Sequence, residues 1–302
     1  MDSVLAQTFS DWEYVIVDDG STDASAAIAL GYADRDPRIK VVQRPNGGVA
    51  AARNTGVRAA TPGCDYVLWF DGDDVLEPTM LELLVSYLDA HPRAGAVLCN
   101  RQHIDESGVR VKAGWRPVRL VPGPLSMPRR LAETMPLTPF AALFVQDGVT
   151  NPSSTLVRRH VFDQTPGWDE TLGPFEDWDL IFRIALLSEF HYLPDTLIRY
   201  RIGHPGQATA HSDKGRLKFL ELYRRWSCYQ GVPEHQVALV REAIRFREGR
   251  VLPLQWLAWG TDRLIHGQFV AAARSYAVAL KAVALYTLRS ITRRYDQPPL
   301  HI

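Results

Sequence analysis

The stretch Tyr66-Val67-Leu68-Trp69-Phe70-Asp71-Gly72-Asp73-Asp74 joins an apolar run to a cluster of aspartates, and Val15-Ile16-Val17-Asp18-Asp19-Gly20-Ser21 does the same earlier in the chain. Continuous apolar runs of this kind are typical of buried strands in a parallel sheet. Ligands of open α/β sheets bind beyond the carboxyl ends of the strands. Carboxylates packed together there repel one another, and a hard cation relieves that repulsion. The two stretches therefore predict an α/β fold that binds a divalent cation and a phosphorylated ligand.

The composition is that of an ordinary globular protein. Its 302 residues suffice for one large domain with an appendage or for two domains. Thirty-four basic residues balance thirty-four acidic ones, so we expect no nucleic-acid partner. The three cysteines, Cys64, Cys99 and Cys228, fit neither a disulfide framework nor a zinc site, which favours a reducing, cytoplasmic compartment. We find no signal-peptide pattern and no apolar run long enough to span a membrane.

Strand and helix patterns alternate along the first hundred residues. Strands are expected over 13–17, 39–43, 65–70 and 94–100, and helices over 2–7, 24–33, 49–60 and 77–90. This alternation predicts a mostly parallel sheet with helical crossovers. Later elements are a helix over 176–187 and strands over 190–193 and 197–200, while proline-rich loops are expected within 101–150. From about residue 213 the pattern is helical, so we divide the chain into domains 1–210 and 211–302.

Both aspartate clusters can be interpreted either as ligand-binding groups or as ordinary turn and capping residues. In extended backbone, residues two apart project to the same side, so Asp71 and Asp73 can face one ligand, with Gly72 allowing close approach to the backbone. Asp18 and Asp19 can accept hydrogen bonds from a base or a ribose. The alternative for both clusters is a solvated turn or a helix cap, because Asp and Gly are common turn residues.

A third segment, residues 46–56, begins with glycines and continues as an expected helix. Backbone N–H groups left free at the start of a helix suit a phosphate, and Arg53 adds a forked cationic donor. The alternative is close packing of small residues, with Arg53 as a surface charge. The spacing is neither that of a dinucleotide fingerprint nor that of a P-loop.

Two later positions are candidates for chemistry. Glu176-Asp177-Trp178-Asp179 opens the helix over 176–187, where a carboxylate can serve as a general base or simply complement the helix dipole. His204 follows a strand and can contact a metal or a diphosphate, although turn histidines are more often merely exposed.

Taken in order, these motifs resemble those of the family 2 glycosyltransferases. The resemblance covers roughly residues 3–210 and rests on the ordered series rather than on any single motif. The matching segments are SVLAQTFSDWE (3–13), VDDGSTD (17–23), NGGVAAARNTG (46–56), FDGDD (70–74), NPSSTLVRR (151–159), GWDE (167–170), EDWDL (176–180) and YRIGHPG (200–206).

The resemblance implies a glycosyltransferase-A type fold, with a nucleotide-binding α/β domain and a mostly parallel sheet, followed by a C-terminal all-helical region. It implies an inverting, metal-dependent hexosyltransferase that moves a sugar from a nucleotide-sugar, by default a UDP-sugar, to a saccharide or lipid-linked acceptor. The implied setting is surface polysaccharide or glycan synthesis on the cytoplasmic side. This setting is an analogy at the level of the family.

The resemblance also implies roles for individual residues. Asp19, with Asp18 beside it, would recognise the base, and Arg53 would lie near the donor. Asp71 would face the ribose, and Asp73 would hold Mg²⁺ or Mn²⁺.

On the acceptor side, the resemblance implies that Asp177 deprotonates the acceptor hydroxyl, with Glu176 as the alternative base. His204 would approach the metal or the diphosphate.

The chain departs from the family at its start. Family members begin with an apolar strand and a Pro-Thr-Tyr-Asn-like segment before the motif at 3–13, and we expect this first strand to be missing here. Its loss would expose a sheet edge. A non-catalytic, truncated relative with a partner-binding role is therefore an alternative, and a nucleotidyltransferase-like enzyme is another.

The C-terminal region contains an apolar-rich stretch, 271–288, interrupted by Arg274 and Lys281 and followed by Arg289, Arg293 and Arg294. This pattern suits an interfacial helix on an anionic membrane, which would make the protein peripheral to the inner face. The alternative is a helix packed against the catalytic domain or a second subunit.

Overall fold

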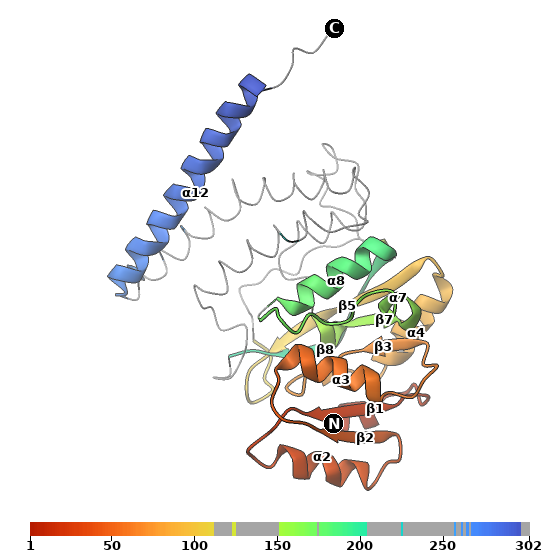
Figure 1. Ribbon diagram of the computed structural model, residues 1–302. Coiled ribbons are helices and arrows are strands. Elements are labelled where there is room, and N and C mark those ends of the chain that lie inside the picture. Colours follow the sequence, from red (N-terminus) through yellow and green to blue (C-terminus); the bar gives the residue numbers. More distant parts are fainter. Residues whose placement is uncertain are drawn as a thin grey trace. The chain divides into compact units, whose positions relative to one another are not determined.

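The computed structural model describes residues 1–111, 123–124, 151–173 and 175–203, and further along the chain 225, 257, 261, 264–265 and 267–296 (Figure 1). Of the side chains in the last segment, 282 and 285–296 are not described. His204 and most of the loops expected within 101–150 lie outside these ranges, as does most of the helical pattern from residue 213 to 266.

The first half of the chain alternates strands and helices as the sequence predicts. The elements are α1 (Asp2–Leu5), β1 (Tyr14–Asp18), α2 (Ser25–Ala33), β2 (Ile39–Gln43), α3 (Val49–Ala59), β3 (Tyr66–Leu68), β4 (Val75–Leu76), α4 (Met80–Ala90), β5 (Ala94–Ile104), β6 (Gly123–Pro124), a 3₁₀ turn (Pro152–Ser154), β7 (Thr155–Arg158), α7 (Arg159–Phe162), α8 (Glu176–Leu187), β8 (Glu189–Arg201) and α12 (Phe269–Asp296). The expected boundaries of β2 and α8 match those of the structure.

Among the described residues, the strands form two sheets. Strands β1 and β2 pair in parallel, with Tyr14 opposite Ile39 and Asp18 opposite Gln43. The larger sheet has the order β3-β7-β5-β8-β4, with β6 also paired to β8. Within it, β5 and β8 are parallel, whereas β3–β7, β5–β7, β4–β8 and β6–β8 are antiparallel.

The predicted α/β fold is confirmed, and the described strands pair in both directions. The predicted parallel pairing holds for β1–β2 and for the long β5–β8 pair, whereas the shorter pairings are antiparallel. Strand β7 inserts between β3 and β5 and runs antiparallel to both. The strand–helix alternation of residues 13–100, from which the parallel pairing is predicted, does not extend to this later strand.

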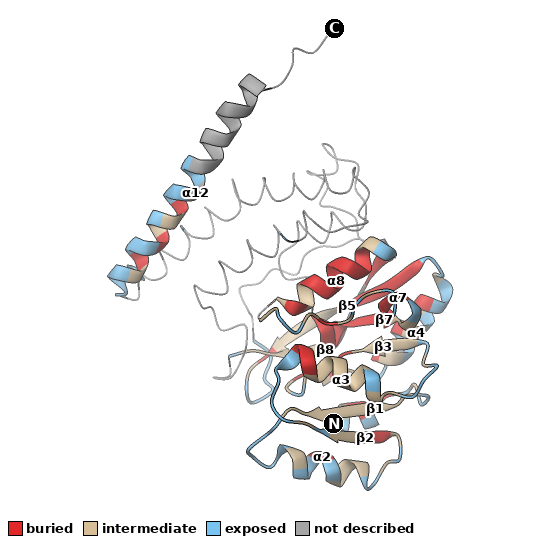
Figure 2. Cartoon of the chain, in the orientation of Figure 1, coloured by how far each residue is buried: buried red, intermediate tan, exposed pale blue. Residues whose placement is uncertain are grey.

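The hydrophobic core lies around β5, both of whose faces are covered. Met80, Leu84 and Leu88 recur at every fourth position of α4 and are fully buried. They pack in one cluster with Val97 and Cys99 of β5. Because side chains alternate along a strand, Leu98 points to the opposite face. Helix α8 also contacts β5 and buries most of its own side chains (Figure 2).

The chain divides into two compact units, Met1–Leu222 and Tyr223–Ile302. The domain boundary that we place near residue 210 stays a prediction. In the second unit, α12 buries small side chains, Ala272, Ser275 and Ala279, and exposes large apolar ones. Among the helices described, none combines the length and the apolar character needed to cross a membrane.

Candidate functional site

The turn after β3 is shaped by hydrogen bonds from distant parts of the chain. The Asp74 amide donates to the Asp71 carbonyl at 3.2 Å, which closes the turn. The Asp71 amide donates to the Oγ of Ser153 at 3.0 Å, and Ser153 is itself fully buried. Arg201, at the end of β8, donates from Nε to the Asp73 carbonyl at 2.9 Å. The acidic turn is therefore a built structure rather than a solvated loop.

Asp74 is the buried member of this turn. Its Oδ1 accepts a hydrogen bond from the Arg201 amide at 3.1 Å, and 5% of the residue is exposed. Burial raises the pKa of Asp74 to about 7; hydrogen bonds from Ser153 and Arg201 oppose the rise, and the charges of Asp73 and Asp71 add to it. No sequence pattern distinguishes Asp74 from its acidic neighbours in this way.

A second acidic group lies at the start of α8. The helix is entered through Phe175, a non-glycine residue with φ of 89°. A bulky residue in this left-handed region carries strain, which is found most often at functional sites. Glu176 is buried and Asp177 half-buried. Asp179 is buried in an ion pair with Arg183 at 2.7 Å, one turn further along the same helix. Asp179 therefore stabilises α8 and is not a candidate base.

The two carboxylates at the helix start have raised pKa values. Burial raises the pKa of Asp177 to about 7, with a further contribution from the charge of Glu176, while Arg53 and the Trp178 amide oppose the rise. Burial likewise raises the pKa of Glu176, against Arg53. A helix N-terminus on its own stabilises a carboxylate. Here the cost of burying two adjacent charges outweighs that effect.

Arg53 joins the two acidic groups. From the middle of α3, its guanidinium donates to Asp71 at 2.8 Å and to Glu176 at 3.0 Å, with 11% of the side chain exposed. The same guanidinium lies over the ring of Trp168, 4.4 Å from its centroid. Burial alone would lower the pKa of Arg53, but the charges of Asp71, Glu176 and Asp177 outweigh it and raise the pKa above its usual value. The Arg53 side chain therefore stays positively charged. Arg53 thus places the strand-end and helix-start acids in one site.

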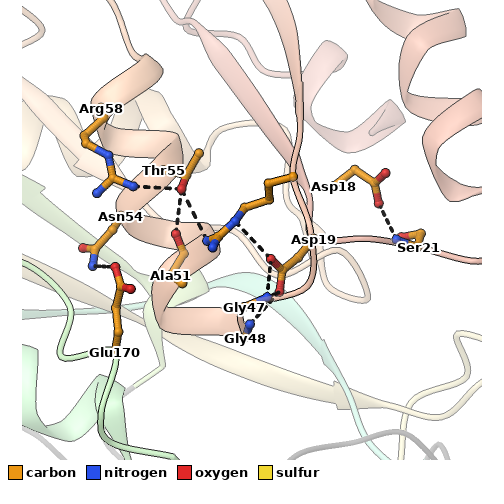
Figure 3. Close-up of polar contacts among 11 residues, drawn as sticks. Asp18, Asp19, Ser21, Gly47, Gly48, Ala51, Asn54, Thr55, Arg58 and Glu170 are labelled. Carbon is orange, nitrogen blue, oxygen red and sulfur yellow. Dashed lines mark hydrogen bonds and ion pairs between the residues drawn. The ribbon is translucent and has the colours of Figure 1, made fainter.

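Asp19 makes contacts within the chain at the start of α3. Its carboxylate accepts hydrogen bonds from the amides of Gly47 at 3.0 Å and Gly48 at 2.7 Å, and it pairs with Arg44 at 3.4 Å (Figure 3). The glycine amides that the sequence offered to a phosphate are therefore occupied by Asp19, which holds the start of α3. Asp18 lies beside it and accepts a hydrogen bond from the Ser21 amide at 3.0 Å.

The acidic turn has the chemistry of a cation site. Within the described part of the chain, no three His, Cys, Asp or Glu side chains come together as a metal-binding group. The turn nevertheless carries three carboxylates, Asp71, Asp73 and Asp74, and carboxylate oxygens are the ligands that Mg²⁺ and Mn²⁺ prefer. Mg²⁺ commonly takes one or two protein carboxylates and completes its shell with phosphates and water. The residues present fit that arrangement.

Of the expected site residues, the structure brings together Arg53, Asp71, Glu176 and Asp177, keeps Asp73 on the same turn as Asp71, and places Asp18 and Asp19 at the end of β1. Sequence reasoning missed Ser153, which supports the turn, and Trp168, which lies under Arg53. Both belong to segments that resemble the family, NPSST and GWDE, and that resemblance was the available signal.

Known glycosyltransferases resemble this chain in sequence. The chain is similar to the glycosyltransferase GlyA of Streptococcus pneumoniae, with 31% identity over 67% of this chain and 28% of that protein. It is also similar to the uncharacterized glycosyltransferase EpsJ of Bacillus subtilis, with 46% identity over 28% of this chain and 24% of EpsJ. The chain thus spans about a quarter of the length of these relatives.

Solved structures show the fold. TarS of Staphylococcus aureus superimposes with a TM-score of 0.61 at 17% identity, covering 99% of this chain and 87% of that one. The mannosyltransferase PcManGT of Pyrobaculum calidifontis, solved with GDP-Man and Mn²⁺, gives 0.58 at 18% identity, covering 96% and 74%. The fold is of the glycosyltransferase-A type. A family model described as "Glycosyl transferase family 2" matches residues 1–163, and the chain belongs to that family.

Proposed function

We propose that this chain carries the catalytic site of an inverting, metal-dependent glycosyltransferase that moves a sugar from a nucleotide-sugar to a saccharide or lipid-linked acceptor. The observation that carries the proposal is the position of Arg53 between Asp71 and Glu176. It joins a strand-end turn suited to a nucleotide and a cation to a half-buried carboxylate, Asp177, whose pKa of about 7 suits proton transfer.

Asp177 is the proposed general base. A sugar hydroxyl is a poor nucleophile at neutral pH, and a base whose pKa lies near the working pH accepts its proton most effectively. As that proton passes to Asp177, the hydroxyl oxygen forms a bond to the anomeric carbon. The bond from this carbon to the diphosphate oxygen breaks on the opposite side, and the nucleoside diphosphate leaves. Displacement in one step inverts the anomeric centre, with Glu176 as the alternative base.

The donor site is proposed at the ends of β1 and β3. Asp71 would contact the ribose, Asp18 and Asp19 the base, and Arg53 the donor. Asp19 would accept a hydrogen bond from the base through carboxylate lone pairs that do not bond the Gly47 and Gly48 amides.

Asp73, with His204 as a further candidate, would hold Mg²⁺ or Mn²⁺. When bound, the cation would stabilise the negative charge of the leaving diphosphate. PcManGT, which has the same fold, was solved with a nucleotide-sugar and Mn²⁺, and this supports the proposal. A UDP-sugar is the proposed donor, and surface polysaccharide synthesis on the cytoplasmic side is the proposed setting.

Helix α12 is proposed as a peripheral contact with an anionic membrane. Phe269, Val270 and Leu280 are 68%, 70% and 69% exposed. The segment 269–296 contains five basic residues and a single acidic one. Apolar side chains flanked by cations suit the surface of an anionic bilayer.

Sedimentation with vesicles tests this contact. The protein should bind phosphatidylglycerol vesicles and not phosphatidylcholine vesicles, and Leu280→Asp should abolish binding. Ile28→Asp, at another exposed apolar position, on α2 and 54% exposed, is the control and should bind as the unaltered protein does. Binding that is unchanged by Leu280→Asp would refute the assignment to α12.

Calorimetric titration of the 302-residue chain tests the enzymatic proposal. UDP, GDP and dTDP are each titrated with and without Mn²⁺. We expect metal-dependent binding of UDP, followed by transfer from the matching nucleotide-sugar. A folded chain that binds none of the three would contradict the donor site and favour the non-catalytic alternative.

A further inference from the structure

Asn54, the residue after Arg53 on α3, holds a loop more than a hundred residues away in the chain. Its Nδ2 donates to the Trp168 carbonyl at 2.9 Å, and its Oδ1 accepts from the Trp168 amide at 2.9 Å. One amide side chain thus satisfies both backbone groups of Trp168, as a neighbouring strand would. A third bond runs from Nδ2 to the exposed Glu170 carboxylate at 2.8 Å.

The loop is shaped to accept this side chain. Gly167 has φ of +81°, a conformation that side-chain-bearing residues rarely adopt. A Cβ at this position would lie 2.9 Å from Oδ1 of Asn54, which is too close for an ordinary contact. The glycine is therefore required both by the turn and by the approach of Asn54.

Trp168 connects this clamp to the site. The residue is 3% exposed, and its ring packs edge-on against Trp69 at 5.1 Å. The ring also lies beneath the Arg53 guanidinium at 4.4 Å, where the aromatic face attracts the cation. A shift of the Trp168 backbone would move the indole ring, and with it the Arg53 guanidinium that pairs with Asp71 and Glu176.

We infer that Asn54 is a positioning residue, which fixes Trp168 so that Arg53 spans Asp71 and Glu176. Its effect on catalysis rests on the proposed function, whereas its effect on the placement of Arg53 does not. Asn54 need not touch a substrate. The two bonds to the Trp168 backbone carry the effect, because the contact with Glu170 is exposed and hydrogen bonds in water contribute little.

A double-mutant cycle tests the inference. Asn54→Ala should lower kcat/KM about tenfold, since small displacements of catalytic groups are costly. In an Arg53→Met background the same change should cost less than about twofold, because the group that Asn54 positions is gone. The isosteric Asn54→Asp removes the donated bonds at constant shape and should resemble Asn54→Ala. Glu170→Ala should have little effect.

The control is Gln164→Ala, another amide that hydrogen-bonds a backbone carbonyl on the same segment, at 2.9 Å, but on the exposed surface. It should leave kcat/KM unchanged in both backgrounds. Equal losses from Asn54→Ala with and without Arg53 would overturn the inference and leave Asn54 a general structural residue.

Unfolding in urea distinguishes a failure of this inference from a failure of the proposed function. Without any substrate, the decrease in unfolding midpoint caused by Asn54→Ala should shrink in the Arg53→Met background. A protein that transfers no sugar but shows this coupling would refute the function and keep the placement of Arg53. Additive midpoints would refute the placement whatever the activity.

Discussion

The two acidic groups that meet at Arg53 are built differently. Asp71 stands on an open turn after β3 with 36% of its side chain exposed, whereas Glu176 stands at the start of α8 with 10% exposed. Its neighbour Asp177 has a pKa raised to about 7 by burial and by the charge of Glu176. The comparison shows that burial and neighbouring charge, rather than residue type, set these carboxylates apart. On that difference rest their proposed separate roles, in donor binding at the strand end and in proton transfer at the helix start.

The largest effect is expected at the helix start. Asp177→Asn removes the proton acceptor at constant shape, and kcat should fall about a thousandfold, the range of general-base catalysis. Binding of UDP with Mn²⁺, measured by calorimetry, should change little. Asp163→Asn, in an exposed ion pair with Arg159, is the control and should retain full activity. Loss of nucleotide binding in Asp177→Asn would mean that the helix-start carboxylate also binds the donor, which would contradict separate roles for the two acidic groups.

The strand-end group should respond in the opposite way. Asp73→Ala removes a proposed cation ligand, so the gain in UDP affinity on adding Mn²⁺ should disappear in calorimetry, a loss of about a hundredfold or less. Asp34→Ala, at the exposed end of α2, should preserve that gain. A metal requirement that survives Asp73→Ala would exclude this residue as the ligand.

Arg53 tests the connection between the groups. Lysine keeps the charge but cannot span two carboxylates with a planar fork. Arg53→Lys should therefore lower kcat/KM about tenfold and also weaken UDP binding, because both groups lose a partner. Steady-state kinetics and calorimetry measure the two effects. If Arg53→Lys affected kinetics and binding no more than Arg93→Lys, an exposed arginine, the bridge would have no function.

The smallest effect is expected at the other strand end. Asp19→Ala removes the acceptor for the Gly47 and Gly48 amides, and the free energy of unfolding should fall by about 1 kcal/mol, as for loss of a helix cap. Urea denaturation measures this, with Asp11→Ala on the exposed loop before β1 as the control. Because Asp19 is also proposed to contact the base, UDP affinity should fall in the same variant. An unchanged stability would contradict the capping role, and an unchanged UDP affinity would contradict the base contact.

Local patterns were enough to predict much of the fold. The periodicity of 39–43 and of 176–187 gave β2 and α8, and the strand-to-aspartate junction at 66–71 placed Asp71 at the end of β3. These features depend on residues that are neighbours in sequence. The order of β3, β7 and β5 depends instead on pairing between distant segments, which periodicity does not encode.

The site shows the same limit. Chemistry-bearing residue types at strand and helix ends pointed to Asp71, Asp73, Glu176 and Asp177. The contact of Arg53 with Glu176 joins residues 123 positions apart, and no local rule predicts it. The hydrogen bonds from the Gly47 and Gly48 amides to Asp19 were equally unpredictable, because they join residues 28 and 29 positions apart. Sequence reasoning had assigned these amides to a phosphate.

The pH dependence of kcat, measured with saturating donor and acceptor, tests the central claim most directly. The base must be ionised to accept a proton, and burial raises the pKa of Asp177 to about 7. We therefore expect kcat to rise through a single ionisation near pH 7 and to fall tenfold per pH unit below it. The acid limb should be absent from the residual activity of Asp177→Asn. A kcat that is constant from pH 5 to 9, or an acid limb that persists in Asp177→Asn, would contradict the account.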